Sequence, residues 1–474
     1  MEDRAQLDRM DEQSLRQLAS ALLGQIAYIQ HENDSLRQDN TYKQCRIDQL
    51  SHEMALLKRV QFAARSEAFN AVQRQLFEET MDADLAAIAC ELAALKTPQK
   101  PTEEKATPRR APLPANLPRR EINHEPAQTV CSCGCSLTRI GEDVSEKLDY
   151  TPGSFTVERH VRGKWVCADC QTLIQAPVPP HVIDKGIPTT GLLAQVLVAK
   201  YADHQPLNRQ EAIFGRAGVP IPRSTLAQWV GECGVQLQPL VDALRACLMA
   251  RPVLHADETP VAMLAPGKGK THRAYVWAYG TTPYDALQAV VYDFADNRAG
   301  ANARRFLADW SGTLVCDDFK GYKALFDAGV TEAGCLAHAR RKFHELWVSS
   351  RSPVAEQALV QFAALYDIER RARHLTADER ARLRANETQP LLDRFHDWLI
   401  LYRQKATDGT PIARAIDYSL KRWEALTRFA GNGDIPADNN SIENRIRPIA
   451  LGRTNWLFAG SLRGGQRWPP LTGQ

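Results

Sequence analysis

Residues 253–257 read Val-Leu-His-Ala-Asp, an apolar run that ends in an acid, and residues 313–317 repeat the pattern as Thr-Leu-Val-Cys-Asp. Two further runs rich in Ala, Val and aromatic residues occupy 274–279 and 289–294, and a helical pattern covers 301–310. Short runs of this kind on either side of a helix predict a mixed α/β module.

The order of these elements is informative. Three adjacent antiparallel strands, a helix and then a parallel strand form the order of a ribonuclease-H-like fold, in which Asp257 lies within the first strand and Asp317 ends the fourth. Residues 438–445 read Asp-Asn-Asn-Ser-Ile-Glu-Asn-Arg and predict a short helix that presents Glu443. Three converging carboxylates can hold two divalent cations, which clamp the attacking and leaving oxygens of a phosphoryl displacement.

The residues alone leave some choices open. Asp317 and Asp318 are adjacent and point to opposite sides if the strand continues, so only one can face the site. Either Asp318 or Glu258 could be a solvated neighbour or a supporting group. Asn440 or Ser441 could cap the helix that carries the third acid.

Length and composition set broad limits. The chain has 474 residues, a net charge of +3 and 11 cysteines. This length predicts several modules, and clustered cysteines indicate a metal rather than disulfides. Without a long apolar run we expect a cytoplasmic, nucleoid-associated protein with no membrane partner.

The N-terminal residues 1–96 fit a heptad repeat with two apolar seams. One seam holds Leu15, Leu22, Ile29, Leu36, Leu50 and Leu57, and the other holds Ala19, Ile26, Asn33, Asn40, Ile47 and Met54. We expect a parallel coiled-coil homodimer, with a monomeric helical hairpin as the alternative. Residues 97–128, rich in Pro and Arg, predict an extended linker.

Residues 129–182 contain two groups of cysteines joined by strand-like sequence, the pattern of a zinc ribbon. The ligands come from Cys131, Cys133, Cys135, Cys167 and Cys170. The second group has ordinary C-x2-C spacing, whereas the first is irregular and leaves open which two of its three cysteines bind. We expect the zinc to be structural, because thiolates can fill all four positions.

Residues 187–250 read as helices with a helix-turn-helix outline. The break lies at 218–222, and Ser224 is a plausible N-cap for the helix that follows. In this outline Arg209, Arg223 and Gln228 would face DNA. Any helical hairpin gives a similar pattern, so the outline alone is not specific.

The α/β core is expected in two parts, residues 251–345 and 433–474, separated by an all-helical insertion at 346–432. Cations near the acids predict contacts to a polyanion. They are Arg340, Arg341, Arg445, Arg447 and Arg453. Cys335 and His338 form a C-x2-H pair, but two further zinc ligands are not apparent, so the pattern favours a packed Cys and a hydrogen-bonded His.

Several stretches closely resemble the transposases of the insertion-sequence-66 family. They are residues 255–261, 332–343, 438–444 and 455–461, and the cysteine-rich segment resembles the zinc-binding domain of that family at 141–143 and 148–150. The resemblance runs from about residue 45 to 467.

The resemblance implies a DDE-type recombinase that uses Mg²⁺ or Mn²⁺ to cleave element ends and to join the freed 3′ hydroxyls to target DNA. Asp257 and Glu443 match the first and third acids of the family. The second stands four residues before a Gly and an aromatic, so Gly321 and Tyr322 select Asp317. The implied partners are double-stranded DNA of the terminal repeats and the target, further copies of the chain in a homodimer or higher oligomer, and helper proteins of the same element.

The C-terminus departs from the family pattern. Family members continue through another helix, whereas Pro469 and Pro470 predict a stop here. We therefore expect a truncated C-terminal region, which weakens the expectation of activity. A non-catalytic DNA-binding regulator from a decayed copy and a ribonuclease-H-type nuclease remain the alternatives.

Overall fold

The computed structural model describes residues 12–63, 71–95, 113–126, 130, 135–151, 153–183, 186–265, 270–456, 459 and 461–471. The chain divides into two compact units, residues 1–63 with 88–108 and residues 64–87 with 109–474. Each unit has buried apolar residues of its own.

The first unit contains helix α2 (Glu12–Ala63) and the end of helix α3 (Ala71–Leu95). The two helices pack through the residues Ile47, Leu50, Met54 and Leu57 of α2 and Ile88, Leu92 and Leu95 of α3. The α2 residues are those of the predicted seams, so the later part of the heptad repeat is covered within one chain, as in the hairpin alternative. Upstream, Ile29 and Leu36 of the same seam remain more than half exposed, at 53% and 54%.

A four-stranded sheet follows in the second unit. Its strands are β1 (Arg119–His124), β2 (Leu137–Thr151), β3 (Ser154–Cys167) and β4 (Leu173–Gln175). The order is β1-β3-β2, with β4 also paired to β3. The prediction of a linker as far as residue 128 is therefore wrong for 119–124.

Charge pairing explains why this basic segment forms a strand. Arg120 pairs with Glu158 and Glu121 pairs with Arg159, each at 3.2 Å and each between β1 and its neighbour β3. Arg119 reaches past β3 to Glu146 of β2 at 2.9 Å. Opposite charges on neighbouring strands stabilise a sheet without the apolar alternation that a sequence pattern detects.

Three helices pack against the apolar residues of this sheet. They are α4 (Thr190–Tyr201), α5 (Leu207–Arg216) and α6 (Arg223–Met249). The turn before α6 contains Gly218, whose φ of +84° suits glycine. Helix α6 begins at Arg223 after Pro222, so the prediction that Ser224 caps it is wrong.

The second sheet has five strands in the order β7-β6-β5-β8-β9. They are β5 (Val253–Ala265), β6 (Lys270–Thr281), β7 (Val290–Ala295), β8 (Thr313–Cys316) and β9 (Thr331–Gly334). Strands β5, β6 and β7 pair antiparallel, whereas β8 pairs parallel to both β5 and β9. The strands, directions and intervening helix predicted from the sequence are therefore present.

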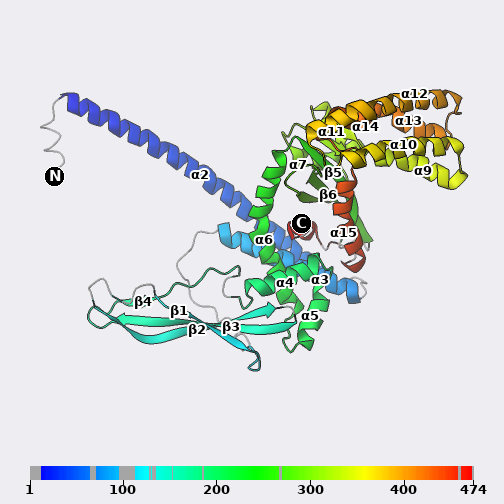
Figure 1. The fold of residues 1–474 in the computed structure, drawn as a ribbon. Coiled ribbons are helices and arrows are strands. Elements are labelled where there is room, and N and C mark those ends of the chain that lie inside the picture. The colour runs from blue at the N-terminus through cyan, green and yellow to red at the C-terminus, as the bar shows by residue number, and fades with distance from the viewer. Residues whose placement is uncertain are drawn as a thin grey trace. The chain divides into compact units, whose positions relative to one another are not determined.

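Both faces of this sheet are covered (Figure 1). Helices α6 and α7 (Gly300–Leu307) bury one face, where Leu254 and Ala256 point. Helix α9 (Leu336–Ser350) and the helices after it bury the other face near Val253 and Val315. Alternate strand residues point to opposite faces, which explains this division.

Residues 346–432 continue from α9 and are otherwise helical, as predicted. The helices of this range are α10 (Pro353–Ala372), α11 (Ala377–Leu383), η3 (Arg384–Thr388), α12 (Gln389–Lys405), α13 (Pro411–Lys421), α14 (Trp423–Thr427) and η4 (Arg428–Gly431). Two short helices, η2 (Lys320–Tyr322) and α8 (Lys323–Asp327), lie earlier in the chain, between β8 and β9. Ser352, Thr376 and Thr410 cap α10, α11 and α13 with their side chains.

Fully buried Arg384 joins these helices to the segment that follows them. It pairs with Glu369 at 2.6 Å and donates to the carbonyls of Phe429, Asn432 and Ile435 at 2.8–3.0 Å. This segment leads directly into α15, so the insertion fixes the approach of the last helices.

Two helices complete the fold, α15 (Asn440–Trp456) and α16 (Leu462–Leu471). Pro469 and Pro470 lie inside the bounds of α16, so the prediction that they stop this helix is wrong. None of the described helices combines the length and the apolar composition that crossing a bilayer requires.

Candidate active site

Two acids lie at the same level of neighbouring parallel strands. The pairing of β5 with β8 ends with His255 opposite Val315. Asp257 and Asp317 each follow two residues later, Asp257 within β5 and Asp317 directly after β8. Adjacent strands lie about 4.8 Å apart, so both carboxylates reach one region of the sheet.

The electrostatics of Asp257 reflect this crowding. Burial is the main cause that raises its pKa, to about 8, and repulsion from Glu258, Asp317 and Glu443 adds to it. A buried carboxyl among other acids is stabilised either by holding a proton or by binding a cation.

Glu258, the neighbour of Asp257, is already engaged by protein groups. Its side chain is only 1% exposed and pairs with Arg298 at 2.5 Å. The Tyr322 hydroxyl also donates to it at 3.0 Å. Burial raises the pKa of Glu258, while the hydrogen bond from Arg298 opposes the rise. Both carboxylate oxygens of Glu258 therefore already have hydrogen-bond partners in the protein.

The two adjacent acids of the second island differ in their partners. Asp317 accepts the backbone N–H of Phe319 at 3.0 Å. Asp318 is half exposed and lies 3.6 Å from Arg422 of the insertion. Strand β8 ends at Cys316, so strand alternation does not apply to this pair, and both acids line one pocket.

Glu443 lies in the first turn of α15. The helix begins at Asn440, whose backbone N–H donates to Asp438 Oδ1 at 3.1 Å. Asp438 therefore supplies the side-chain oxygen at this helix start, where we had expected Asn440 or Ser441.

Buried Asn439 ties this helix to the sheet. Its side-chain N–H donates to the carbonyl of Ala256 at 2.9 Å, and its side-chain oxygen lies 2.6 Å from His255 Nδ1. Because that oxygen accepts, His255 Nδ1 donates. Burial lowers the pKa of His255 to about 4, so the ring is neutral near pH 7. The backbone N–H of Asn439 also donates to Cys335 Sγ at 3.2 Å.

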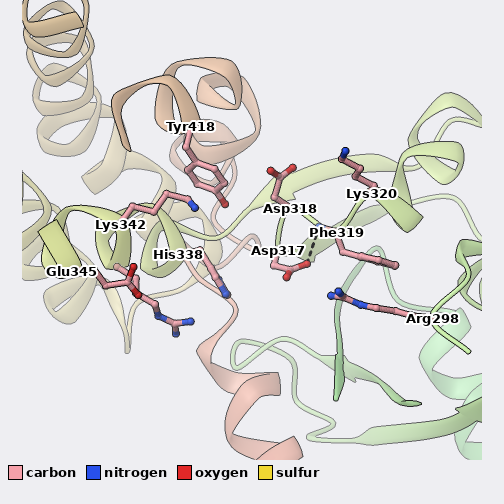
Figure 2. A pocket seen from close by; sticks show the side chains of 10 residues that line it. Arg298, Asp317, Asp318, Phe319, Lys320, His338, Lys342, Glu345 and Tyr418 are labelled. Atoms are coloured by element: carbon pink, nitrogen blue, oxygen red, sulfur yellow. Dashed lines mark hydrogen bonds between the residues drawn. The ribbon is translucent and has the colours of Figure 1, made fainter. Parts of the chain in front are cut away.

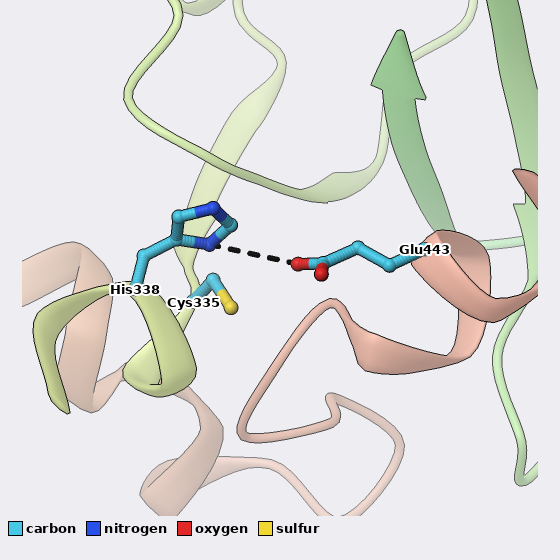
Figure 3. Close-up of side chains that lie close together, drawn as sticks. All are labelled: Cys335, His338 and Glu443. Carbon is cyan, nitrogen blue, oxygen red and sulfur yellow. Dashed lines mark ion pairs between the residues drawn. The ribbon is translucent and has the colours of Figure 1, made fainter. Parts of the chain in front are cut away.

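The other side of Glu443 faces α9 (Figure 3). His338 Nδ1 lies 3.7 Å from one carboxylate oxygen, and Arg341 lies 3.7 Å from the other. The ligand atoms of Cys335, His338 and Glu443 all lie within 4.8 Å of one another. The C-x2-H motif gave two of these residues, but nothing in the sequence linked them to Glu443.

An open pocket of about 570 Å³ lies beside Asp317 (Figure 2). Its wall combines acids, cations and two aromatic rings from several elements. The lining residues are Arg298, Asp317, Asp318, Phe319, Lys320, His338, Arg341, Lys342, Glu345 and Tyr418. Tyr418 comes from helix α13 of the insertion, and Lys342 Nζ lies 4.4 Å from the centre of its ring.

The side chains predicted to face DNA differ in their surroundings. The exposed ones are Arg209, Gln228, Arg340, Arg341, Arg447 and Arg453. Arg223 and Arg445 are half-buried. Arg445 donates to the Gln288 side chain at 2.8 Å and to the Ala289 carbonyl, so it also holds α15 to the sheet.

Three of the predicted zinc ligands lie in the described part of the chain. Cys167 ends β3, and its carbonyl accepts the backbone N–H of Gln171 at 3.0 Å in a tight turn that includes Cys170. Cys135 packs near Cys167. Cys131 and Cys133 lie outside the described residues.

Comparison with known proteins identifies a transposase. A family model described as "Transposase IS66 family" matches residues 185–467. Models described as "Transposase C of IS166 homeodomain" and "zinc-finger binding domain of transposase IS66" match residues 49–122 and 128–171.

Similar proteins support the same assignment. The uncharacterized protein y4qI of Sinorhizobium fredii is 37% identical over 444 residues, which are 89% of this chain and 81% of that protein. The uncharacterized protein y4hP of the same organism is 35% identical over 400 residues, covering 80% and 72%. The chain belongs to the IS66 family of transposases, and its domains fit binding of DNA and zinc.

Proposed function

We propose that this chain is a DDE-type transposase that cleaves the ends of its element and joins the freed 3′ ends to target DNA. The acids of the site are Asp257, Asp317 and Glu443. The observation that carries the proposal is structural: Asp257 and Asp317 lie at the same level of the neighbouring parallel strands β5 and β8, and Asn439 ties the start of α15, which carries Glu443 in its first turn, to β5.

The strand order supports a ribonuclease-H-like core built from residues 251–345 and 433–474. Three antiparallel strands are followed by α7 and by two strands parallel to the first, in the spatial order β7-β6-β5-β8-β9. Residues 346–432 form an insertion into that core, after the N-terminal helices at 1–96, the zinc ribbon at 129–182 and the DNA-binding helices at 187–250.

The donor set fits Mg²⁺ or Mn²⁺, because both prefer hard oxygen ligands. Burial is the main cause that raises the pKa of Asp257, and repulsion from the neighbouring acids adds to it, so a bound cation would stabilise the charged carboxylates there. Bound ions would stabilise the attacking and leaving oxygens of the phosphoryl transfer.

The pocket beside the acids supplies groups for the DNA backbone. Arg298, Lys320, Arg341 and Lys342 surround it with positive charge, and cations next to a metal site are suited to phosphates. Tyr418 adds an aromatic face from the insertion, so we infer that the insertion contacts DNA at this point.

Cleavage of a labelled element end in the presence of Mg²⁺ tests the proposal. Asp257→Asn, Asp317→Asn and Glu443→Gln should each lower the nicking rate by at least about 100-fold, because each removes a metal ligand. Asp318→Asn is the matched control: it neutralises an acid on the same pocket wall that already pairs with Arg422, and it should keep most of the activity.

Three outcomes separate the alternatives. Nicking followed by joining to target DNA supports the transposase, whereas nicking alone indicates a nuclease. DNA binding without nicking indicates a regulator. Equal activity of Glu443→Gln and the wild type would refute the DDE assignment.

We also propose that α2 forms a parallel dimer through residues 23–40. Ile26, Ile29 and Leu36 are about half exposed in the single chain, although they continue the seams that α3 covers further along. Asn33 and Asn40 occupy a positions, where a polar residue fixes register and favours two strands.

A further inference from the structure

Two buried polar atoms beside the proposed acids lack hydrogen bonds. They are His338 Nδ1 and Glu443 Oε1, which face each other at 3.7 Å. Buried polar atoms usually have partners, so two such atoms aimed at one point mark a place where another group binds. Cys335 Sγ lies within 4.8 Å of both ligand atoms.

We propose that Cys335, His338 and Glu443 bind a thiophilic divalent cation of the Zn²⁺ class, at a site that shares Glu443 with the Mg²⁺ acids. Sulfur, imidazole nitrogen and carboxylate oxygen are the three ligand types that zinc uses in proteins. Three protein ligands leave one position for water or for a group of the DNA.

The spacing of the ligand atoms is close to what such an ion needs. Zinc binds nitrogen and oxygen at about 2.0–2.2 Å, so two such ligands in a tetrahedral site lie about 3.3–3.5 Å apart. The nitrogen and oxygen observed here would move together by a few tenths of an ångström. Small side-chain rotations would achieve this. Cys335 directly precedes α9 and His338 lies in its first turn, so both side chains lie at the same end of that helix, facing Glu443 (Figure 3).

The surroundings of the sulfur select the type of ion. The backbone N–H of Asn439 donates to Cys335 Sγ at 3.2 Å, and the backbone of His338 also hydrogen-bonds to it. These bonds would stabilise the thiolate that forms when a bound ion displaces the thiol proton. Hard Mg²⁺ does not displace that proton, whereas a thiophilic ion does and releases it to solvent.

Occupation of this site has a consequence for catalysis. Glu443 Oε1 points toward His338, so an ion held there draws this carboxylate away from Asp257 and Asp317. Zinc should then compete with Mg²⁺. The competition rests on the proposed role of Glu443, whereas binding of the ion does not.

Cobalt binding tests the site without any need for activity. Full-length protein that holds one zinc per chain, the amount needed to fill the ribbon, is titrated with Co²⁺, and thiolate-to-cobalt absorption and bound metal per chain are measured. We expect one additional cobalt ion in the wild type and none in Cys335→Ala or His338→Ala. His338 is partly exposed on the pocket wall, so its variant should fold even if loss of the buried sulfur disturbs packing.

Cys247→Ser is the control, because Cys247 is an exposed cysteine on α6 and should leave the cobalt signal unchanged. No additional cobalt in the wild type, or equal cobalt in the wild type and His338→Ala, would overturn the site.

Zinc inhibition of Mg²⁺-dependent nicking then tests the competition. The Zn²⁺ concentration for half inhibition should rise at least about tenfold in His338→Ala relative to the wild type, each measured against its own uninhibited rate. An unchanged value would refute the competition. A wild type that binds cobalt but does not nick DNA would count against the proposed function and still support the ion site.

Discussion

Asp257→Asn should stabilise the metal-free protein near neutral pH. The pKa of Asp257 is about 8 in the folded protein against an ordinary value of 3.8. The folded state therefore keeps a proton that the unfolded chain loses near pH 4. Stability of the metal-free protein falls as the pH rises from about 4 to about 8, and the loss is complete above that range. Asparagine has no proton to lose, so the variant avoids this loss.

The size of the effect follows from the two pKa values. At about pH 7 the unfolded carboxyl lies roughly three units above its pKa, and each unit corresponds to about 1.4 kcal/mol, which gives a ceiling of about 4 kcal/mol. Four acids share the repulsion, and Asp257 is not fully buried, so we expect about 2 kcal/mol. That corresponds to an increase in Tm of roughly 4–8 °C for a module of this size.

Thermal unfolding monitored by tryptophan fluorescence can measure this difference, because Trp277 is fully buried on the strand opposite Glu258. Mg²⁺ is withheld rather than chelated, so that zinc stays bound. Between about pH 5 and pH 8 the Tm of Asp257→Asn should increasingly exceed that of the wild type. Added Mg²⁺ should raise the Tm of the wild type more than it raises the Tm of the variant. Asp318→Asn, at a half-exposed acid, should not change the pH dependence. A variant no more stable than the wild type at about pH 8 would refute the raised pKa of Asp257.

Other contacts give sharper local tests. Asn439→Ala should raise the Mg²⁺ concentration for half-maximal nicking about tenfold or more, because it frees the helix of the third acid; an unchanged Mg²⁺ titration would contradict this role. Arg384→Met should lower the free energy of unfolding by about 3–5 kcal/mol in urea, because it leaves Glu369 buried without its partner; a loss under about 1 kcal/mol would contradict it. The double variant Ile29→Asp and Leu36→Asp should convert a dimer into a monomer in light scattering while metal-free Tm stays unchanged, and a persistent dimer would refute the α2 interface.

Local sequence signals predicted much of the α/β module. The strands that carry or precede Asp257 and Asp317 could be predicted because each is a short apolar run that ends in an acid. The order of the strands then predicted that the two acids lie on neighbouring strands. The insertion was readable as helix because capping residues and helical periodicity are local properties.

Features that depend on distant pairing were missed or misjudged. Strand β1 was read as linker because its pairing depends on Glu146 and Glu158 of other strands. The cap of α15 was assigned to the wrong residue, since the choice among neighbouring polar residues depends on backbone direction. The link between His338 and Glu443 left no local signal, because more than a hundred residues separate them.

The third acid depends on polar contacts more than the first two do. Asp257 lies in strand β5 and Asp317 directly follows strand β8, so the hydrogen bonds of paired strands hold the backbone at or next to each acid. Helix α15 packs on the sheet through apolar side chains, Ile442, Ile446 and Ile449, and apolar packing alone tolerates sliding and rotation.

Directional hydrogen bonds remove that freedom. Asn439 fixes the start of α15 to β5 and to Cys335, while Arg384 fixes the segment before it to the insertion. Buried polar groups of this kind have few satisfactory arrangements, because each broken bond leaves an unsatisfied group in a low-dielectric interior. The insertion therefore does more than lengthen the chain between the second and third acids: through Arg384 it sets where the helix of Glu443 begins, and a change in its packing would be felt at that carboxylate.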